Sequence, residues 1–116
     1  MYQYKATVDY VVDGDTLDIT IDLGFKITTH QRIRLADINT PEIFSVKKDS
    51  EEHKRGMAAK QYVEKRLADN DNKIVIETEK NTGKYGRYIG TIFLADSDIT
   101  LNEELVKEGH ALKVKY

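Results

Sequence analysis

The sequence predicts a mainly β protein that also contains helices, an α+β fold. Three observations predict it. First, three strand-like segments follow one another, and the second shows strict alternation of apolar and polar residues. Second, two further strand-like segments are joined by a loop with two glycines; third, a helix lies between these two groups and a short helix follows them. A three-strand meander followed by a helix and a two-strand hairpin fits a small closed barrel of the OB type. We therefore expect a five-stranded OB-fold β-barrel. A chain of 116 residues favours a single domain over residues 1–116.

The first three strands are predicted from β-branched residues and from period 2. Residues 4–12 mix β-branched and aromatic side chains, which favour strands. In residues 16–23 apolar side chains alternate with polar ones, as in a strand with one face on a core. These apolar positions are Leu17, Ile19, Ile21 and Leu23. Gly24 permits a hairpin turn, and residues 26–35 return with Ile33 and Leu35 on one face. The three segments predict a meander.

A loop and a helix follow. Residues 36–50 show no period and contain the only proline, so they predict a loop. Ser50, followed by acidic residues, is typical of a helix start. The apolar side chains of Ala59, Val63 and Leu67 recur every four residues, and the turn-forming residues 69–72 end the helix.

The last elements are two strands and a short helix. Residues 73–78 and 87–94 predict strands, and the polar loop 79–86 joins them. Residues 100–109 predict a short helix that ends at Gly109.

The composition limits the function classes. The chain has 18 basic and 20 acidic residues, so any nucleic-acid contact must come from a local basic cluster. It has no cysteine and therefore no disulfide framework. The N-terminus lacks the pattern of a signal peptide, and no apolar run is long enough to span a membrane. We expect a cytoplasmic protein without a membrane partner.

A group of oxygen donors and two arginines carries the predicted chemistry. Asp13 and Asp15 flank Gly14 at the first hairpin, and Arg34 lies near the end of the third strand, on the face opposite Ile33 and Leu35. The next loop supplies Asn39, Thr40 and Glu42, and the later segment GKYGR supplies Lys84, Tyr85 and Arg87. Taken singly, each of these is more often a turn or a surface residue.

Together these residues suit hydrolysis of a phosphodiester. Oxygen ligands select a hard cation such as calcium or magnesium. A carboxylate can accept the proton of an attacking water, and arginines complement the charge that develops on the phosphoryl oxygens.

The segments VVDGDT, RLADINTPE, GKYGR and LNEELVKEGHA resemble, in order and spacing, the staphylococcal nuclease (thermonuclease) family. The resemblance covers nearly the whole chain. It implies an OB-fold barrel and a calcium-dependent nuclease, with one calcium ion, that hydrolyses DNA and RNA and leaves 3′-phosphate ends.

The resemblance also implies residue roles. Asp15 would be a calcium ligand, Asn39 stands at the second ligand position, and Thr40 would add its backbone carbonyl. Glu42 would be the general base. Arg34 and Arg87 would bind the scissile phosphate. The residues implied to contact the rest of the substrate are Lys84, Tyr85 and Tyr116.

Asn39 departs from the family pattern, which has an aspartate at this position. An amide oxygen can coordinate calcium, but it brings no charge, so we expect weaker metal binding. If the segment were extended, the side chains of Asp37 and Asn39 would lie on the same face. We hypothesise that Asp37 partly restores the missing charge.

Two functions therefore remain open. The first is an active metal-dependent nuclease; the second is an OB-fold module with weak or no catalytic activity that binds nucleic acid or protein. We find no base-reading element, so we expect sequence-blind binding with a preference for single strands. We expect a monomer. A homodimer is the alternative, because family members commonly continue with a further C-terminal helix, and a second copy could cover the surface on which that helix packs.

Overall fold

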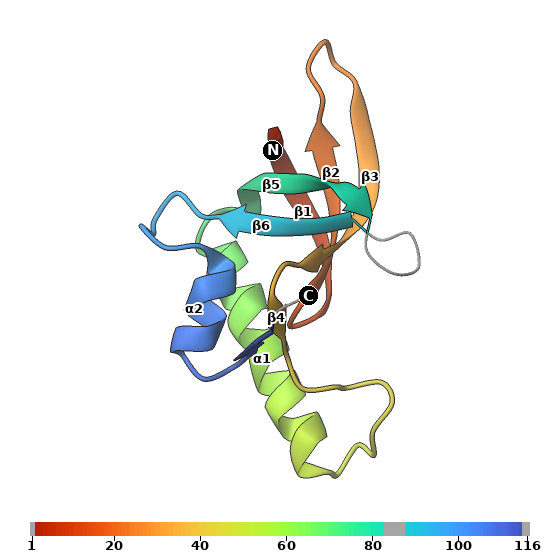
Figure 1. Ribbon diagram of the computed structural model, residues 1–116, viewed down its shortest axis with the longest axis vertical. Coiled ribbons are helices and arrows are strands. Elements are labelled where there is room, and N and C mark those ends of the chain that lie inside the picture. Colours follow the sequence, from red (N-terminus) through yellow and green to blue (C-terminus); the bar gives the residue numbers. More distant parts are fainter. Residues whose placement is uncertain (1, 83–87, 115–116) are drawn as a thin grey trace.

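The computed structural model describes residues 2–82 and 88–114 (Figure 1). Five strands form a closed barrel in the order β1-β2-β3-β6-β5. Their bounds are β1 Tyr2–Asp13, β2 Thr16–Asp22, β3 Thr28–Leu35, β5 Lys73–Thr82 and β6 Tyr88–Phe93. Neighbouring strands pair antiparallel except β3 and β6, which pair parallel and close the barrel. The predicted five-stranded OB-type barrel is confirmed.

The alternation in β2 places its apolar residues in the core. Leu17, Ile19 and Ile21 are buried, but Leu23 is 45% exposed because β2 ends at Asp22. The predicted strand was thus one residue too long, and β3 begins at residue 28 rather than 26. The β2–β3 hairpin extends beyond the barrel (Figure 1), and Phe25 at its tip is 98% exposed.

Helix α1 (Glu51–Ala68) follows the predicted pattern. The Ser50 side chain accepts a hydrogen bond from the backbone N–H of His53, which caps the first turn. The predicted stripe of Ala59, Val63 and Leu67 is fully buried, and α1 packs beside β1 (Figure 1). The short helix α2 (Leu101–Lys107) also forms as predicted, capped by Thr100. Neither helix in the described part of the chain has the length and apolarity that crossing a membrane requires.

A small second sheet lies where the sequence predicts only a loop. β4 (Ile38–Asn39) pairs antiparallel with β7 (Leu112–Lys113). Two residues are too few to show a period, and the pairing partner lies far along the chain. The prediction of an unpaired segment from 36 to 50 is therefore wrong at residues 38 and 39. The pairing fixes the segment that carries the predicted site.

Asn102 of α2 holds the closing edge of the barrel. Its side-chain oxygen accepts a hydrogen bond from the Ile92 N–H at 3.0 Å. Its side-chain nitrogen donates to the backbone carbonyls of Ala36 and Gly90, at 3.0 and 3.2 Å. These contacts join α2 to β6 and to the end of β3. A buried amide with all these partners stabilises the edge where the only parallel pair in the barrel forms.

An ion-pair cluster joins α1 to α2. The Arg66 guanidinium donates to Glu104 at 2.6 Å and to Asp96 at 2.7 Å, and the Tyr62 hydroxyl donates to Glu104 at 2.7 Å. The Glu104 side chain is only 10% exposed and that of Arg66 16%, whereas Asp96 is 43% exposed, so the Arg66–Glu104 pair is the part of the cluster removed from water. Burial of Tyr62 and its bond to Glu104 raise the pKa of the phenol to about 12.

Candidate active site

The Asp13–Gly14–Asp15 turn is pressed against α1 and Thr40. A Cβ at Gly14 would lie 2.9 Å from the Ala59 Cβ and 2.9 Å from the Thr40 Cγ2, closer than side-chain atoms approach one another. Glycine is therefore needed at position 14 for this close approach. The turn brings Asp15 into contact with the segment that begins with β4.

Asp15 is buried and bonded on all sides. Its Oδ2 accepts the backbone N–H of Thr40 at 3.0 Å, and its Oδ1 accepts the Thr16 hydroxyl at 3.1 Å. Its backbone carbonyl accepts the Leu35 N–H at 2.8 Å. These bonds hold Asp15 between the start of β2, the end of β3 and the residue that follows β4.

Arg34 joins Asp15 to Asn39. The pairing of Thr16 with Arg34 places the guanidinium on the polar face of β3, as predicted, and its Nη2 lies 3.3 Å from the Asp15 Oδ2. The same Nη2 donates to the Asn39 Oδ1, and Nη1 donates to the Leu35 carbonyl at 3.1 Å. The Asp15 and Asn39 oxygens therefore converge on one cationic nitrogen.

The pKa values of the two carboxyls of the turn shift in opposite directions. Burial, the hydrogen bond with Asp15 and the charge of Asp15 raise the pKa of Asp13 to about 7. Burial opposes ionisation of Asp15 too, but the bond with Asp13, the Thr40 N–H and the charge of Arg34 outweigh it, so the pKa of Asp15 is lowered. Asp15 is therefore the more readily ionised carboxyl of the pair.

The donor set suits a hard cation with few anionic ligands. Asp15 and Asn39 present one carboxylate and one amide oxygen to a common point, and hard cations take oxygen ligands of both kinds. In the described part of the chain, no group of three or more acidic or histidine side chains is arranged to hold a metal. A cation here would rely on Asp15 for charge and would compete with Arg34.

Glu42 is one of the residues that line a groove beside this group. The groove has a volume of about 640 Å³ and runs between β4, β7 and α1. Asn39, Thr40 and Glu42 line one side of it, and Glu42 is exposed. The Glu42 N–H donates to the Glu52 carboxylate at 3.3 Å, which ties the loop to α1. An exposed carboxylate at this position can meet a water or a substrate that enters from solvent.

The structure corrects the premise for Asp37. The segment is not extended there: Ala36 and Asp37 form a turn, and Asp37 has φ 62°. The predicted residues Lys84, Tyr85, Arg87 and Tyr116 lie outside the described residues. Asp15, Arg34, Asn39 and Thr40 are the predicted residues that hydrogen bonds join directly.

Comparison with known protein families places this chain in one of them. The family model described as staphylococcal nuclease homologue matches residues 32–116. The chain belongs to the staphylococcal nuclease homologue family. The resemblance predicted from the sequence is thereby confirmed.

Three relatives of this member of the staphylococcal nuclease homologue family are longer than it is. An endonuclease (YhcR) of Bacillus subtilis is 32% identical over 94% of this chain and 9% of its own length. An uncharacterised protein of Methanocaldococcus jannaschii is 33% identical over 93% and 58% of the two chains, and a micrococcal nuclease of Shigella flexneri is 29% identical over 97% and 60%. The chain therefore spans 60% or less of each of these relatives.

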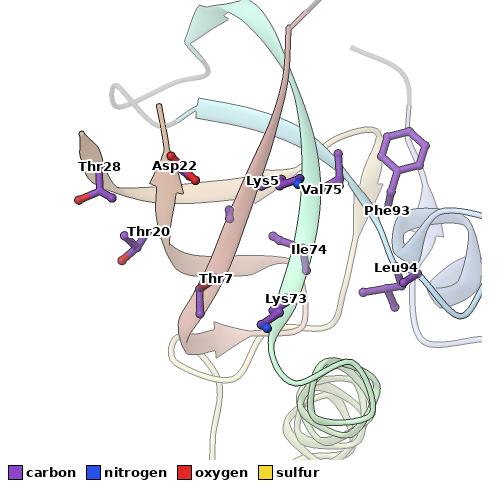
Figure 2. A pocket seen from close by; sticks show the side chains of 12 residues that line it. Lys5, Thr7, Thr20, Asp22, Thr28, Lys73, Ile74, Val75, Phe93 and Leu94 are labelled. Carbon is purple, nitrogen blue, oxygen red and sulfur yellow. The ribbon is translucent and has the colours of Figure 1, made fainter. Parts of the chain in front are cut away.

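A second groove of this family member lies away from the predicted residues. It has a volume of about 630 Å³, and its lining comes from β1, β2, β5, β6 and the start of β3 (Figure 2). Lys5 and Lys73 border it, and Thr20, Asp22 and Thr28 come from the hairpin that extends beyond the barrel. None of the predicted site residues that the structure describes lines it, so the groove beside Glu42 is the better candidate for substrate.

Sequence reasoning missed several contributors to the site of this nuclease homologue. Thr16 bonds to Asp15, and the motif DGDT could have indicated it because Thr16 follows the carboxylate directly. Glu52, Arg55 and His110 line the groove beside Glu42. No local pattern indicated these three, because only the packing of α1 and β7 brings them to the loop.

Proposed function

We propose that this chain is a metal-dependent nuclease that hydrolyses phosphodiester bonds of DNA or RNA. The convergence of the Asp15 carboxylate, the Asn39 amide and the Arg34 guanidinium beside an open groove carries the proposal. Its relatives named endonuclease and micrococcal nuclease support it. Single strands are the preferred substrate, and the products carry 3′-phosphate ends.

Asp15, Asn39 and the Thr40 carbonyl would hold one calcium ion. When bound, calcium supplies Lewis-acid polarisation of the phosphoryl oxygen and orients water. Glu42 would accept the proton of the attacking water. Thr40 keeps Asp15 in place through its N–H, whose bond also favours the ionised carboxylate.

Arg34 changes partners when substrate binds. In the structure its guanidinium donates to Asn39 and to the Leu35 carbonyl and pairs with Asp15. A phosphate offers two oxygens to the guanidinium fork, and this bidentate bond is stronger than the bond to a neutral amide. Arg34 thus turns from Asn39 toward the phosphate, and Arg87 would act with it there.

The test is cleavage of end-labelled single-stranded DNA with millimolar calcium and with chelator. Glu42→Gln and Arg34→Gln should each lower kcat by about 100-fold or more, because each removes a group that acts in the transition state. Arg32→Gln is the matched control for Arg34→Gln. Arg32 lies two residues earlier on β3 and pairs with Asp18 at 2.7 Å on the exposed face. Calcium-independent cleavage, or full activity in Glu42→Gln, contradicts the proposal.

The second candidate is an OB-fold module that binds nucleic acid or protein without cutting. Asn39 favours this second candidate. The family pattern has an aspartate at this position, so the amide leaves the cation site with one negative charge fewer, and the amide oxygen accepts a hydrogen bond from Arg34. Asn39→Asp separates the two candidates. Activity that appears only in Asn39→Asp means that the amide disables an otherwise complete site. Inactivity of both chains makes the binding module the better function.

A further inference from the structure

The groove beside Glu42 is continuous with the candidate phosphate site. Asn39 and Thr40 line the groove and also contact Arg34 and Asp15, and the β4–β7 pairing places Asn39 beside Leu112, which lines the groove too. Opposed residues in an antiparallel pair are about 5 Å apart. The groove therefore begins at the side chain that Arg34 contacts, so it is open to a nucleoside that adjoins a phosphate held at Arg34.

The charges of the groove oppose a second phosphate there. Glu42, Glu52 and Glu108 line it, against one arginine, Arg55. Burying an anion among carboxylates is unfavourable, whereas a neutral group with hydrogen-bond donors is favoured. The part of a nucleic acid that fits this requirement is the base, not the sugar–phosphate backbone.

The walls of the groove suit a flat, largely apolar ring. Pro41, Ala111 and Leu112 provide apolar surface, and Leu112 is 75% exposed, so it has apolar area left to bury. His110 is fixed in place because its ring packs on Tyr62, with centroids 4.8 Å apart. Tyr62 is itself held by Glu104. A volume of about 640 Å³ lies within the range of small-molecule sites.

We propose that this groove is a nucleoside subsite that favours bases carrying an exocyclic amino group, next to the scissile phosphate. The inference rests on the proposed nuclease function. Glu108 accepts a hydrogen bond from the amino group, as carboxylates do from the cytosine N4, while Leu112 covers one face of the ring. The site adds a base preference to a chain whose sequence indicates none.

The experiment uses end-labelled single-stranded octamers of deoxyuridine in which one position is deoxycytidine. The two bases have the same size but differ at position 4, where cytosine donates and uracil accepts. Cleavage should concentrate at one bond, at a fixed offset from the cytosine, with a preference of about fivefold or more. Glu108→Gln should reduce that preference to below twofold, and Leu112→Ala should raise KM for every octamer. Glu64→Gln is the matched control, because Glu64 is an exposed glutamate on α1 that does not line the groove.

The outcomes separate this inference from the proposed function. Cleavage without a base preference, or a preference that survives in Glu108→Gln, overturns the subsite and leaves the nuclease in place. If no octamer is cut, the nuclease function fails, and fluorescence anisotropy of the same octamers decides the subsite. Tighter binding of the cytosine octamer that Glu108→Gln abolishes supports the subsite. Equal binding of both octamers, or no binding, overturns it.

Discussion

Gly56 sets how closely α1 approaches the loop that carries Glu42. A Cβ at this position would lie 2.5 Å from the Ile43 Cγ2, 2.7 Å from the Pro41 carbonyl oxygen and 3.0 Å from the Glu42 carbonyl oxygen. Carbon atoms in contact are about 3.5–4.0 Å apart, so Gly56→Ala forces a movement of about 1 Å. Two of the three contacts are backbone atoms, which cannot move by rotating a side chain. The loop itself must therefore shift.

The expected effect on activity is larger than the effect on stability. Alanine in a helix interior is favoured over glycine by about 1 kcal/mol, and overpacking costs about 1–3 kcal/mol, so the net loss of stability is about 0–2 kcal/mol. A displacement of about 1 Å in a catalytic group lowers the rate by about 100-fold. Gly56→Ala should therefore remain folded and lose most of its cleavage activity.

Two assays check this prediction. Urea unfolding measures the stability of Gly56→Ala, and cleavage of single-stranded DNA measures kcat, in the Asn39→Asp background if that chain is the more active. Gln61→Ala is the control. Gln61 is exposed on the same helix, so this change places an alanine in α1 without pressing it against the loop. A Gly56→Ala chain with full kcat would refute the argument that α1 positions Glu42.

Three further predictions concern stability. Glu104→Gln should lower the free energy of unfolding by about 2 kcal/mol, because it weakens charged hydrogen bonds from Arg66 and Tyr62; urea unfolding checks it. Hydrogen bonds from Arg66 lower the pKa of Asp96 to about 2. The pKa of Glu104 is also lowered, because its hydrogen bonds from Arg66 and Tyr62 outweigh the effect of burial. The folded state thus keeps both carboxylates ionised at a pH where the unfolded chain is protonated, so their contribution is complete above about pH 5 and lost toward pH 2. Arg66→Met should flatten that dependence in acid unfolding. Phe25→Ser should change stability by less than about 0.5 kcal/mol, since the ring is 98% exposed; a larger loss by thermal unfolding would mean that the tip packs in solution.

Local patterns in the sequence predicted the barrel and both helices. Alternation in β2 and the four-residue stripe of α1 each report which face meets the core, and these residues are buried as expected. Ser50 marked the start of α1 because its side chain satisfies an N–H of the first turn. Such signals depend only on residues close together in the sequence, so they can be recognised without knowledge of the rest of the fold.

The β4–β7 sheet and the ion-pair cluster could not be predicted in the same way. Ile38 and Lys113 pair only because the barrel and α2 bring them together, and two residues carry no period. Glu104 resembles any helix-surface glutamate in the sequence, yet its side chain is 10% exposed because Arg66 lies against it. For the site, the motifs indicated Asp15, Arg34 and Asn39, but the direct bond between Arg34 and Asn39 depends on the turn at residues 36 and 37.

The three hydrogen bonds of Asn102 have a consequence for synthesis of the chain. β1, β2 and β3 can pair as soon as they leave the ribosome, but the parallel pairing of β3 with β6 joins segments far apart in the sequence and forms slowly. Asn102 follows β6, and its amide bonds Ala36 and Gly90 on the two sides of that seam. During translation the sheet therefore remains open, with apolar residues such as Ile33 exposed, until α2 has emerged and the seam can be held.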